Sequence, residues 1–354
     1  MDILAAGGLQ TSCAPLANDD AAQLLLQSYG LQGRLKRLAT EKDDTFHVIT
    51  LQGDQYTLKI ANPGEDPAAV DLQDAILRHI ANRDPGLPVP RAIADRSGQT
   101  ISHYAAPDQS LRLARLLSFI PGTPLDVTPS TAANREKIGA ILARLRHATA
   151  GFSHPAENRV LAWDVQHLPH LAPLLDQVVN PRQRALLAAG LDRFAPTAHQ
   201  IPGLRHQVLH NDFSKSNLIV DPREPDFVTG IIDFGDTLKT AIAIDVSTAM
   251  LNQLPATPAE PVLDAAMDLL RGYLVHADLT APELRALPHL IMGRIIARAL
   301  ITLARARLFP ENCIYILRNT PQCWHQLEWF LDQDADQLSD MFYALSPRPA
   351  ANAP

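Results

Sequence analysis

Short apolar runs separated by polar turns fill the first third of the chain, and this pattern is typical of β-strands. The runs at 46–51 and 55–60 flank Gly53-Asp54, a turn pair that predicts a hairpin. A second hairpin is predicted at 99–105 and 111–120. The sequence therefore predicts a small antiparallel sheet, completed by a strand at 33–39.

Two helices are predicted within this strand-rich part. The first begins at Asn18, whose side chain favours a helix N-terminus, and stops at Gly30. The second begins at Asp66-Pro67, an N-cap followed by a proline in the first turn. Beyond residue 130 the apolar period becomes helical, with helices predicted at 131–149, 168–195, 259–276, 281–309 and 320–340.

A polar loop and two β-branched runs form the most informative stretch of the chain. The runs at 218–220 and 228–232 have the length of buried strands, and a proline-containing acidic turn joins them. The polar loop precedes the first run, and an aspartate follows the second. Such a hairpin is expected to bring Asp212, Asn217 and Asp233 to one end.

These side chains suit phosphoryl transfer. The order H-x-D-x-x-x-x-N, strand, turn, strand and D-F-G matches the catalytic and metal loops of kinases. Asp212 is expected to accept the proton of the attacking hydroxyl, and Asn217 and Asp233 to hold Mg²⁺ through oxygen. His210 is expected to brace the catalytic loop. The alternative is a surface loop whose polar residues only cap turns.

At these residues the chain resembles the aminoglycoside phosphotransferase and choline kinase-like small-molecule kinases. HNDF at 210–213, Asn217 and IDFGD at 232–236 carry the resemblance. Within this group the chain looks most similar to hydroxylysine kinases, near type II homoserine kinases. Asp236 and Asp245 are expected to brace loops rather than touch substrate.

The resemblance implies an α+β, bilobal protein-kinase-like fold. A small N-terminal antiparallel β-sheet lobe with a helix, residues 1–117, is expected to bind the nucleotide. A larger, mostly helical C-terminal lobe, residues 118–354, is expected to hold the catalytic and acceptor-binding groups. The strand-rich first part and helix-rich second part agree with this division.

The family position of a phosphate-binding lysine falls on Lys59, although a surface lysine is the default interpretation of an alternating strand. The loop 40–45 is expected to cover the triphosphate with its amides and the Thr45 hydroxyl, or else to be a solvated turn. Helical phase places Gln73 inward, with Asp74 at the edge, where the fold normally supplies a glutamate. It therefore stays open whether Lys59 is held by the Gln73 amide, by Asp74, or more loosely.

The segment 116–122 ends in Pro-Gly and is interpreted as the crossing between lobes. Backbone groups from Ser118 to Ile120 are expected to read the edge of a purine base. The alternative is an edge strand that ends in a turn.

The acceptor is expected to lie against the helical lobe. Trp163-Asp164 offers an aromatic wall and a carboxylate for an ammonium, or a packed tryptophan with a capping aspartate. Arg294 and Arg298, four residues apart on an apolar helix, suit an acceptor carboxylate, although structural pairing is the alternative, especially for Arg298. Lys215 is a candidate contact of the transferred phosphate, or a surface lysine.

Charge and cysteine content limit the kinds of partner and the cellular compartment that the sequence suits. The formal net charge of -7 argues against a nucleic-acid binder, and the three cysteines, which form no CxxC pair, suit a reducing compartment. Cys13 is expected to be an unmodified thiol. The most apolar helix is interrupted by arginines, so no membrane span is expected. These features predict a cytoplasmic protein.

The sequence thus predicts an ATP- or GTP-dependent, Mg²⁺-requiring kinase of a small hydroxylated amine or amino acid. A hydroxylysine-like acceptor is implied by the resemblance alone. An aminoglycoside kinase is one alternative, and it requires an acidic acceptor pocket. A catalytically silent, kinase-like nucleotide-binding module is the other, since the usual acidic partner of Lys59 is missing.

Overall fold

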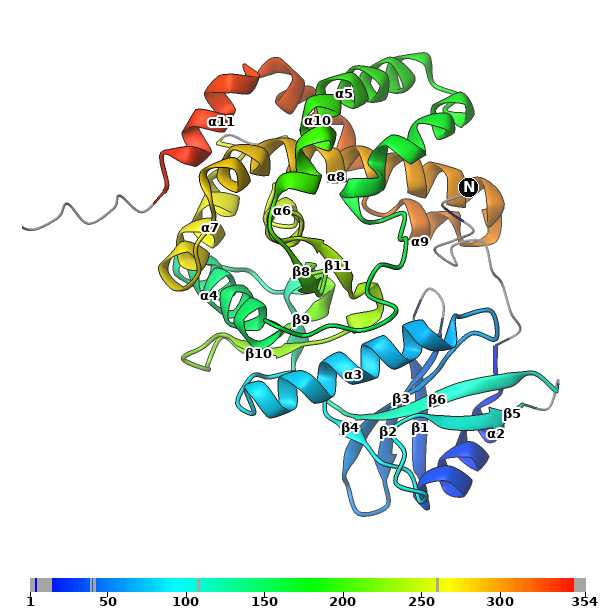
Figure 1. Ribbon diagram of the computed structural model, residues 1–354. Coiled ribbons are helices and arrows are strands. Elements are labelled where there is room, and N and C mark those ends of the chain that lie inside the picture. The colour runs from blue at the N-terminus through cyan, green and yellow to red at the C-terminus, as the bar shows by residue number, and fades with distance from the viewer. Residues whose placement is uncertain are drawn as a thin grey trace, which may run out of the picture.

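The computed structural model describes residues 4, 15–38, 40, 43–106, 109–258 and 261–346. Cys13, Ala39 and residues 41–42 of the predicted phosphate loop lie outside this part. The chain forms a sheet-rich lobe and a larger helical lobe (Figure 1). The predicted α+β, bilobal architecture is confirmed.

The N-terminal lobe is built on a six-stranded antiparallel sheet of order β1-β2-β3-β6-β4, with β5 paired to β6. Alternation sends Phe46, Leu58 and Leu116 to one face, where they form a separate core beneath helix α2. The opposite face points toward the rest of the molecule. The strands are β1 (Gly33–Leu38), β2 (Asp44–Thr50), β3 (Gln55–Ile60), β4 (Ala92–Ile93), β5 (Ser102–Ala105) and β6 (Leu111–Ser118).

Both predicted N-terminal helices are present. Helix α2 (Asn18–Leu24) continues as a π-turn to Tyr29 and ends at Gly30, which takes the left-handed φ of 68° that glycine tolerates. Helix α3 (Pro67–Arg83) starts at Asp66, whose carboxylate accepts from Ala68 N at 2.9 Å. Helix α3 lies between the sheet and the helical lobe, and its apolar stripe joins the core of that lobe (Figure 1).

The C-terminal lobe departs from the predicted helices at two places. Residues 165–177 form 3-10 turns rather than the start of a long helix, because Pro169 and Pro173 lack the N–H that an α-helix needs. The predicted helix 320–340 is two helices, because Asp334 starts a new one by accepting from Gln337 N at 2.9 Å. The helices are α4 (Ala132–Ala148), α5 (Pro181–Gln200), α6 (Ile242–Leu251), α7 (Asp264–His276), α8 (Ala281–Leu308), α9 (Cys313–Leu317), α10 (Pro321–Asp332) and α11 (Ala335–Tyr343).

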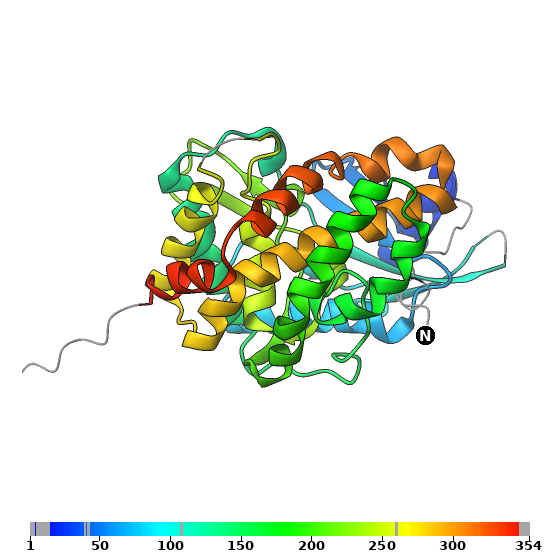
Figure 2. The ribbon, with the colours of Figure 1, turned by 90° about the horizontal axis from the view of Figure 1, so that it is seen from above.

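Helix α8 runs through the middle of this lobe, with α5 crossing it (Figure 2). It is long and apolar enough to span a membrane by composition, yet 83% of its apolar window is buried inside the protein. Burial in the core accounts for its composition. Elsewhere in the lobe two glycines let α4 and α7 approach each other closely, because a Cβ at Gly139 or Gly272 would lie 2.0 Å from a backbone oxygen of the other helix.

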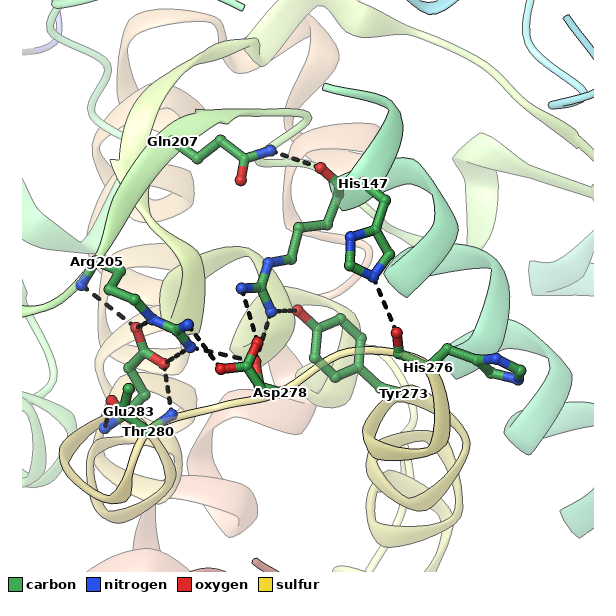
Figure 3. A network of polar contacts seen from close by, with 9 residues as sticks. His147, Arg205, Gln207, Tyr273, His276, Asp278, Thr280 and Glu283 are labelled. Carbon is green, nitrogen blue, oxygen red and sulfur yellow. Dashed lines mark hydrogen bonds and ion pairs between the residues drawn. The ribbon is translucent and has the colours of Figure 1, made fainter. Parts of the chain in front are cut away.

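A polar network fixes the start of α8 (Figure 3). Glu283 is fully buried and accepts from Arg205 Nε at 2.9 Å and from Thr280 N at 2.8 Å. Arg205 also pairs with Asp278 at 2.8 Å, and Asp278 O accepts from Arg146 Nη1 at 2.6 Å. The network thereby ties α4 and the strand after Arg205 to the first turn of α8.

Short strand pairs position the polar loops. The predicted hairpin is β9 (Leu218–Val220) with β10 (Val228–Ile231), and β9 also pairs with β7 (Thr123–Pro124). A second antiparallel pair, β8 (His206–Leu209) with β11 (Leu238–Ala241), was not predicted. Since β8 leads into the H-x-D loop and β11 follows the D-F-G segment, this pair closes the two loops onto each other.

Candidate active site

His210 joins the two loops. It is buried, its Nε2 lies 3.0 Å from the Ile232 carbonyl oxygen, and its Nδ1 accepts from Asp212 N at 3.3 Å. The ring also meets Phe234 edge-on, with centroids 4.6 Å apart. This arrangement matches the bracing position expected for His210.

Two hydrogen bonds hold Asp212 and Asn217 together within the catalytic loop. Asn217 Nδ2 donates to Asp212 Oδ2 at 2.7 Å and to the Asp212 carbonyl at 3.0 Å. Burial, and then the nearby charge of Asp236, raise the pKa of Asp212 to about 7, although Arg294 opposes the shift. The catalytic loop therefore holds the Asp212 carboxylate in one orientation at the cavity.

The third of these motif residues, Asp233, belongs to the D-F-G segment that follows β10. Its backbone has a φ of 62°, a left-handed conformation that is costly for aspartate and recurs at functional sites. Its Oδ1 accepts from Lys59 Nζ at 2.9 Å, and this ammonium holds the pKa of Asp233 down at about 2. Asp245 accepts from Asn211 N at 2.7 Å, a bracing contact as expected. The structure therefore brings Asp212, Asn217 and Asp233 together, and all three line one cavity.

The donor set suits a hard divalent cation. Asn217 uses only its amide nitrogen in the contacts with Asp212, so its Oδ1 remains for a cation. Asp233 uses Oδ1 toward Lys59 and keeps Oδ2. One amide and one carboxylate oxygen, flanked by room for phosphate oxygens, are the kind of ligands that Mg²⁺ accepts.

A polar row on the sheet reaches the cleft at Lys59, the one member of the row among the described residues that line the cavity. Thr45, Lys59 and Arg115 are direct cross-strand neighbours on β2, β3 and β6. Thr45 belongs to β2 rather than to a loop, and its buried Oγ1 has no hydrogen-bond partner among the described residues. Lys59 contacts Asp233, with Asp43 at 4.0 Å, and these carboxylates raise its pKa against the effect of burial.

The predicted partners of Lys59 are wrong. Gln73 does point inward, but its Oε1 accepts from Arg115 Nη2 at 2.7 Å. Asp74 accepts from Arg78 at 2.8 Å and from Thr100 at 2.7 Å. Helical phase located Gln73 correctly, but it contains no information about an arginine on another strand.

The lobe crossing also differs from expectation. The Ser118 amide donates to the Arg91 carbonyl at 2.9 Å, so it is not free to read a base edge. Ile120 lies against Gly230, where an added Cβ would be 2.5 Å from Ile120 Cγ2. Neither residue is among the described residues that line the cavity.

Trp163 and Arg294 form one wall of this cavity, which has a volume of about 750 Å³. The guanidinium carbon of Arg294 lies 5.3 Å from the Trp163 ring centroid. Asp164, in contrast, is fully buried and accepts from Thr240 Oγ1 and Gln166 N, each at 3.1 Å. It caps the following turn, so its predicted place in the acceptor pocket is wrong.

Arg294 is 5% exposed, and its Nη1 has no hydrogen-bond partner among the described residues. Lys215 and Asp236 also line the cavity. Three further basic residues line the cavity and are not among the predicted site residues: Arg298, Arg305 and Arg318. Helical spacing along α8 is a signal for Arg298 and Arg305 only, because Arg318 follows α9.

Comparison with known proteins identifies the group. A model of the "Phosphotransferase enzyme family" matches residues 34–287. Hydroxylysine kinase of Mus musculus is 22% identical over 361 residues, covering 94% of each chain. Homoserine kinase of Azorhizobium caulinodans is 28% identical over 262 residues, covering 73% of this chain and 76% of the relative.

Solved structures share the fold. A microcompartment-associated aminopropanol kinase superposes with a TM-score of 0.71 at 21% identity, covering 91% of this chain and 100% of that one. Amicoumacin kinase hAmiN, in complex with AMP-PNP, Ca²⁺ and Ami, has a TM-score of 0.68 at 16% identity, covering 94% and 98%. The match of the family model over most of the chain, together with the loops described above, shows that this protein belongs to the phosphotransferase enzyme family and is a small-molecule kinase.

Proposed function

We propose that this kinase transfers the γ-phosphoryl group of ATP or GTP, with Mg²⁺, to the side-chain hydroxyl of a small amino acid, with a hydroxylysine-like acceptor. The hydroxylysine and homoserine kinases to which the chain is similar are named for amino acids that carry a hydroxyl, an ammonium and a carboxylate. The proposal rests on the cavity between the two lobes and on Arg294 within it.

In this proposal Asp212 takes the proton of the attacking hydroxyl, and the contact with Asn217 orients its carboxylate. Asn217 and Asp233 would hold Mg²⁺, which neutralises charge on the phosphates. Lys59 would leave Asp233 to bind the phosphate chain, with the Thr45 hydroxyl beside it, and Lys215 would approach the transferred group. Catalysis then comes mainly from positioning and from charge neutralisation.

Arg294 carries the assignment of the acceptor. A buried guanidinium without hydrogen bonds is costly, so an anionic ligand is expected to complete its shell. Its planar fork suits a carboxylate, and Trp163 supports it from one side. Asp236, which lines the same cavity, would meet the acceptor ammonium in this proposal.

The same wall disfavours an aminoglycoside. Those acceptors are polycations, while the carboxylates that line this cavity are offset by basic residues, among them Arg294, Arg298, Arg305 and Arg318. The geometry also disfavours a silent module, because Asp212, Asn217 and Asp233 converge on one cleft.

We further propose a nucleotide-binding lobe of residues 1–117 and a catalytic and acceptor-binding lobe of residues 118–354. The end of β6 at Ser118 supports this boundary. A reaction that consumes nucleoside triphosphate suits a cytoplasmic location. The net charge of -7 and the burial of α8 are in keeping with partners that are small molecules rather than nucleic acid or membrane.

The test is a comparison of acceptors. Nucleotide consumption is measured with hydroxylysine, homoserine, an amino alcohol of matched length and an aminoglycoside, for the wild type and Arg294→Met. We expect the wild type to prefer a hydroxylated amino acid, and Arg294→Met to raise the KM of that acceptor about 100-fold, since a charge-assisted contact to a carboxylate is lost.

The amino alcohol lacks the carboxylate, so its KM should change little in Arg294→Met. Equal losses for both acceptors would show that Arg294 serves the phosphoryl group instead. Turnover of the aminoglycoside alone would overturn the proposed function.

A further inference from the structure

A second buried arginine, Arg115, lies on β6 beside Lys59 and Gln73, which line the cavity, although Arg115 itself is not among the described lining residues. It is 3% exposed, and its one hydrogen bond among the described residues is to the neutral amide of Gln73. No carboxylate of the described part of the chain forms an ion pair with it. Arg112, on the same strand and equally buried, pairs with Asp44 at 3.1 Å. Arg115 is therefore a buried cation without an anionic contact.

The surrounding carboxylates are engaged elsewhere. Asp43 and Asp233 lie 4.0 and 2.9 Å from the Lys59 ammonium, Glu65 pairs with Arg159, and Asp74 is bound by Arg78 and Thr100. They act on Arg115 only from a distance, and burial lowers the pKa of its guanidinium. Burying a charge in this way is costly unless an anion arrives to complete its contacts.

The position of Arg115 indicates which anion. Arg115 is the direct cross-strand neighbour of Lys59, and such neighbours have Cβ atoms about 5 Å apart on the same face of the sheet. Lys59 and Gln73, its two neighbours, both line the cavity. The nucleotide proposed above would bring its phosphate chain to Lys59 and so within reach of a second cation.

We propose that Arg115 is a second phosphate-binding cation of the donor site, oriented by Gln73. A glutamate at position 73 would form an ion pair with Arg115 and cancel its charge. The glutamine amide holds the guanidinium in place and leaves the charge for phosphate. This inference rests on the proposed nucleotide site and adds to it a residue that recognises the phosphate chain.

The experiment measures dissociation constants by calorimetry for a nucleoside triphosphate with Mg²⁺ and for the corresponding nucleoside. Arg115→Met and Gln73→Glu are compared with the wild type, and Arg112→Met is the matched control from the same strand. We expect Arg115→Met to weaken triphosphate binding at least tenfold with little change for the nucleoside. Gln73→Glu should likewise weaken binding of the triphosphate relative to that of the nucleoside. Arg112→Met should leave the ratio of the two affinities unchanged.

An unchanged ratio of triphosphate to nucleoside affinity in folded Arg115→Met would overturn the inference while the proposed function stands. If Arg115→Met does not fold, the nearly isosteric Gln73→Glu decides by the same ratio. Failure of the wild type to bind triphosphate with Mg²⁺ at all would instead contradict the proposed function.

Discussion

At the scale of single residues, the site depends on which polar groups are satisfied within the protein and which are not. Asp245 and His210 have their partners in neighbouring loops. Arg294, on the cavity wall, and Arg115, beside Lys59, form no ion pair within the described part of the chain. A ligand is expected where such a group lies on or beside the cavity, because buried charges otherwise find partners of opposite charge.

Asn217→Ala tests whether this side chain both orients Asp212 and binds Mg²⁺. It removes both the donor to Asp212 and the proposed metal oxygen. We expect kcat/KM to fall about 100-fold and half-maximal activity to require more Mg²⁺. The measurement is a titration of rate against Mg²⁺ concentration.

Asn180→Ala is the control, because Asn180 caps α5 and does not line the cavity. It should cost about 1 kcal/mol of stability and leave the Mg²⁺ titration unchanged. An unaltered titration in Asn217→Ala would contradict the assignment of Asn217 as a ligand.

The motif residues could be predicted from the sequence because a loop, a strand, a turn and a strand fix their relative positions over a short distance. Asp212, Asn217 and Asp233 are such a case. The contact of Gln73 with Arg115 could not be predicted from the sequence, since it joins a helix to a strand 42 residues away. Asp164 was mistaken because a capping aspartate and a ligand-binding aspartate look alike until burial is known.

At the scale of elements, patterns of period 2 and 3.6 were sufficient for strands and helices that have one apolar face. They failed where prolines produced 3-10 turns over residues 165–177 and where strands were very short, as in β8 and β11. Apolar periodicity does not reveal helix α6, because every residue in it is buried and no polar face marks it; only the family resemblance, at Asp245, points to a helix there.

Glu283→Gln tests how α8 is anchored. This side chain is fully buried and pairs with Arg205 while it caps the helix. Removing its charge leaves Arg205 with fewer compensating contacts, and breaking a buried pair typically costs about 3 kcal/mol or more. We expect a loss of about 3 kcal/mol in the free energy of unfolding, measured by urea denaturation.

Glu328→Gln is the matched control, since Glu328 pairs with Arg182 on the surface at 2.6 Å. An exposed pair contributes less than about 1 kcal/mol. Equal effects of the two substitutions would contradict the anchoring role of Glu283.

At the scale of the whole molecule, two cores support one cleft. One core lies beneath α2, and the larger one joins α3 to the helical lobe (Figure 1). The cleft lies where the open face of the sheet meets the loops between β8 and β11, so each lobe contributes charged groups to the same cavity. Such a site assembles only when both lobes are folded and placed together.

The most direct measurement of the central claim is the turnover of Asp212→Asn with nucleotide binding recorded on the same protein. We predict that turnover falls about 1,000-fold, because the base is lost, while the thermal shift caused by nucleoside triphosphate with Mg²⁺ persists. Asp221→Asn, on the exposed turn of the same hairpin, should retain activity. Turnover of Asp212→Asn within tenfold of the wild type would contradict the account.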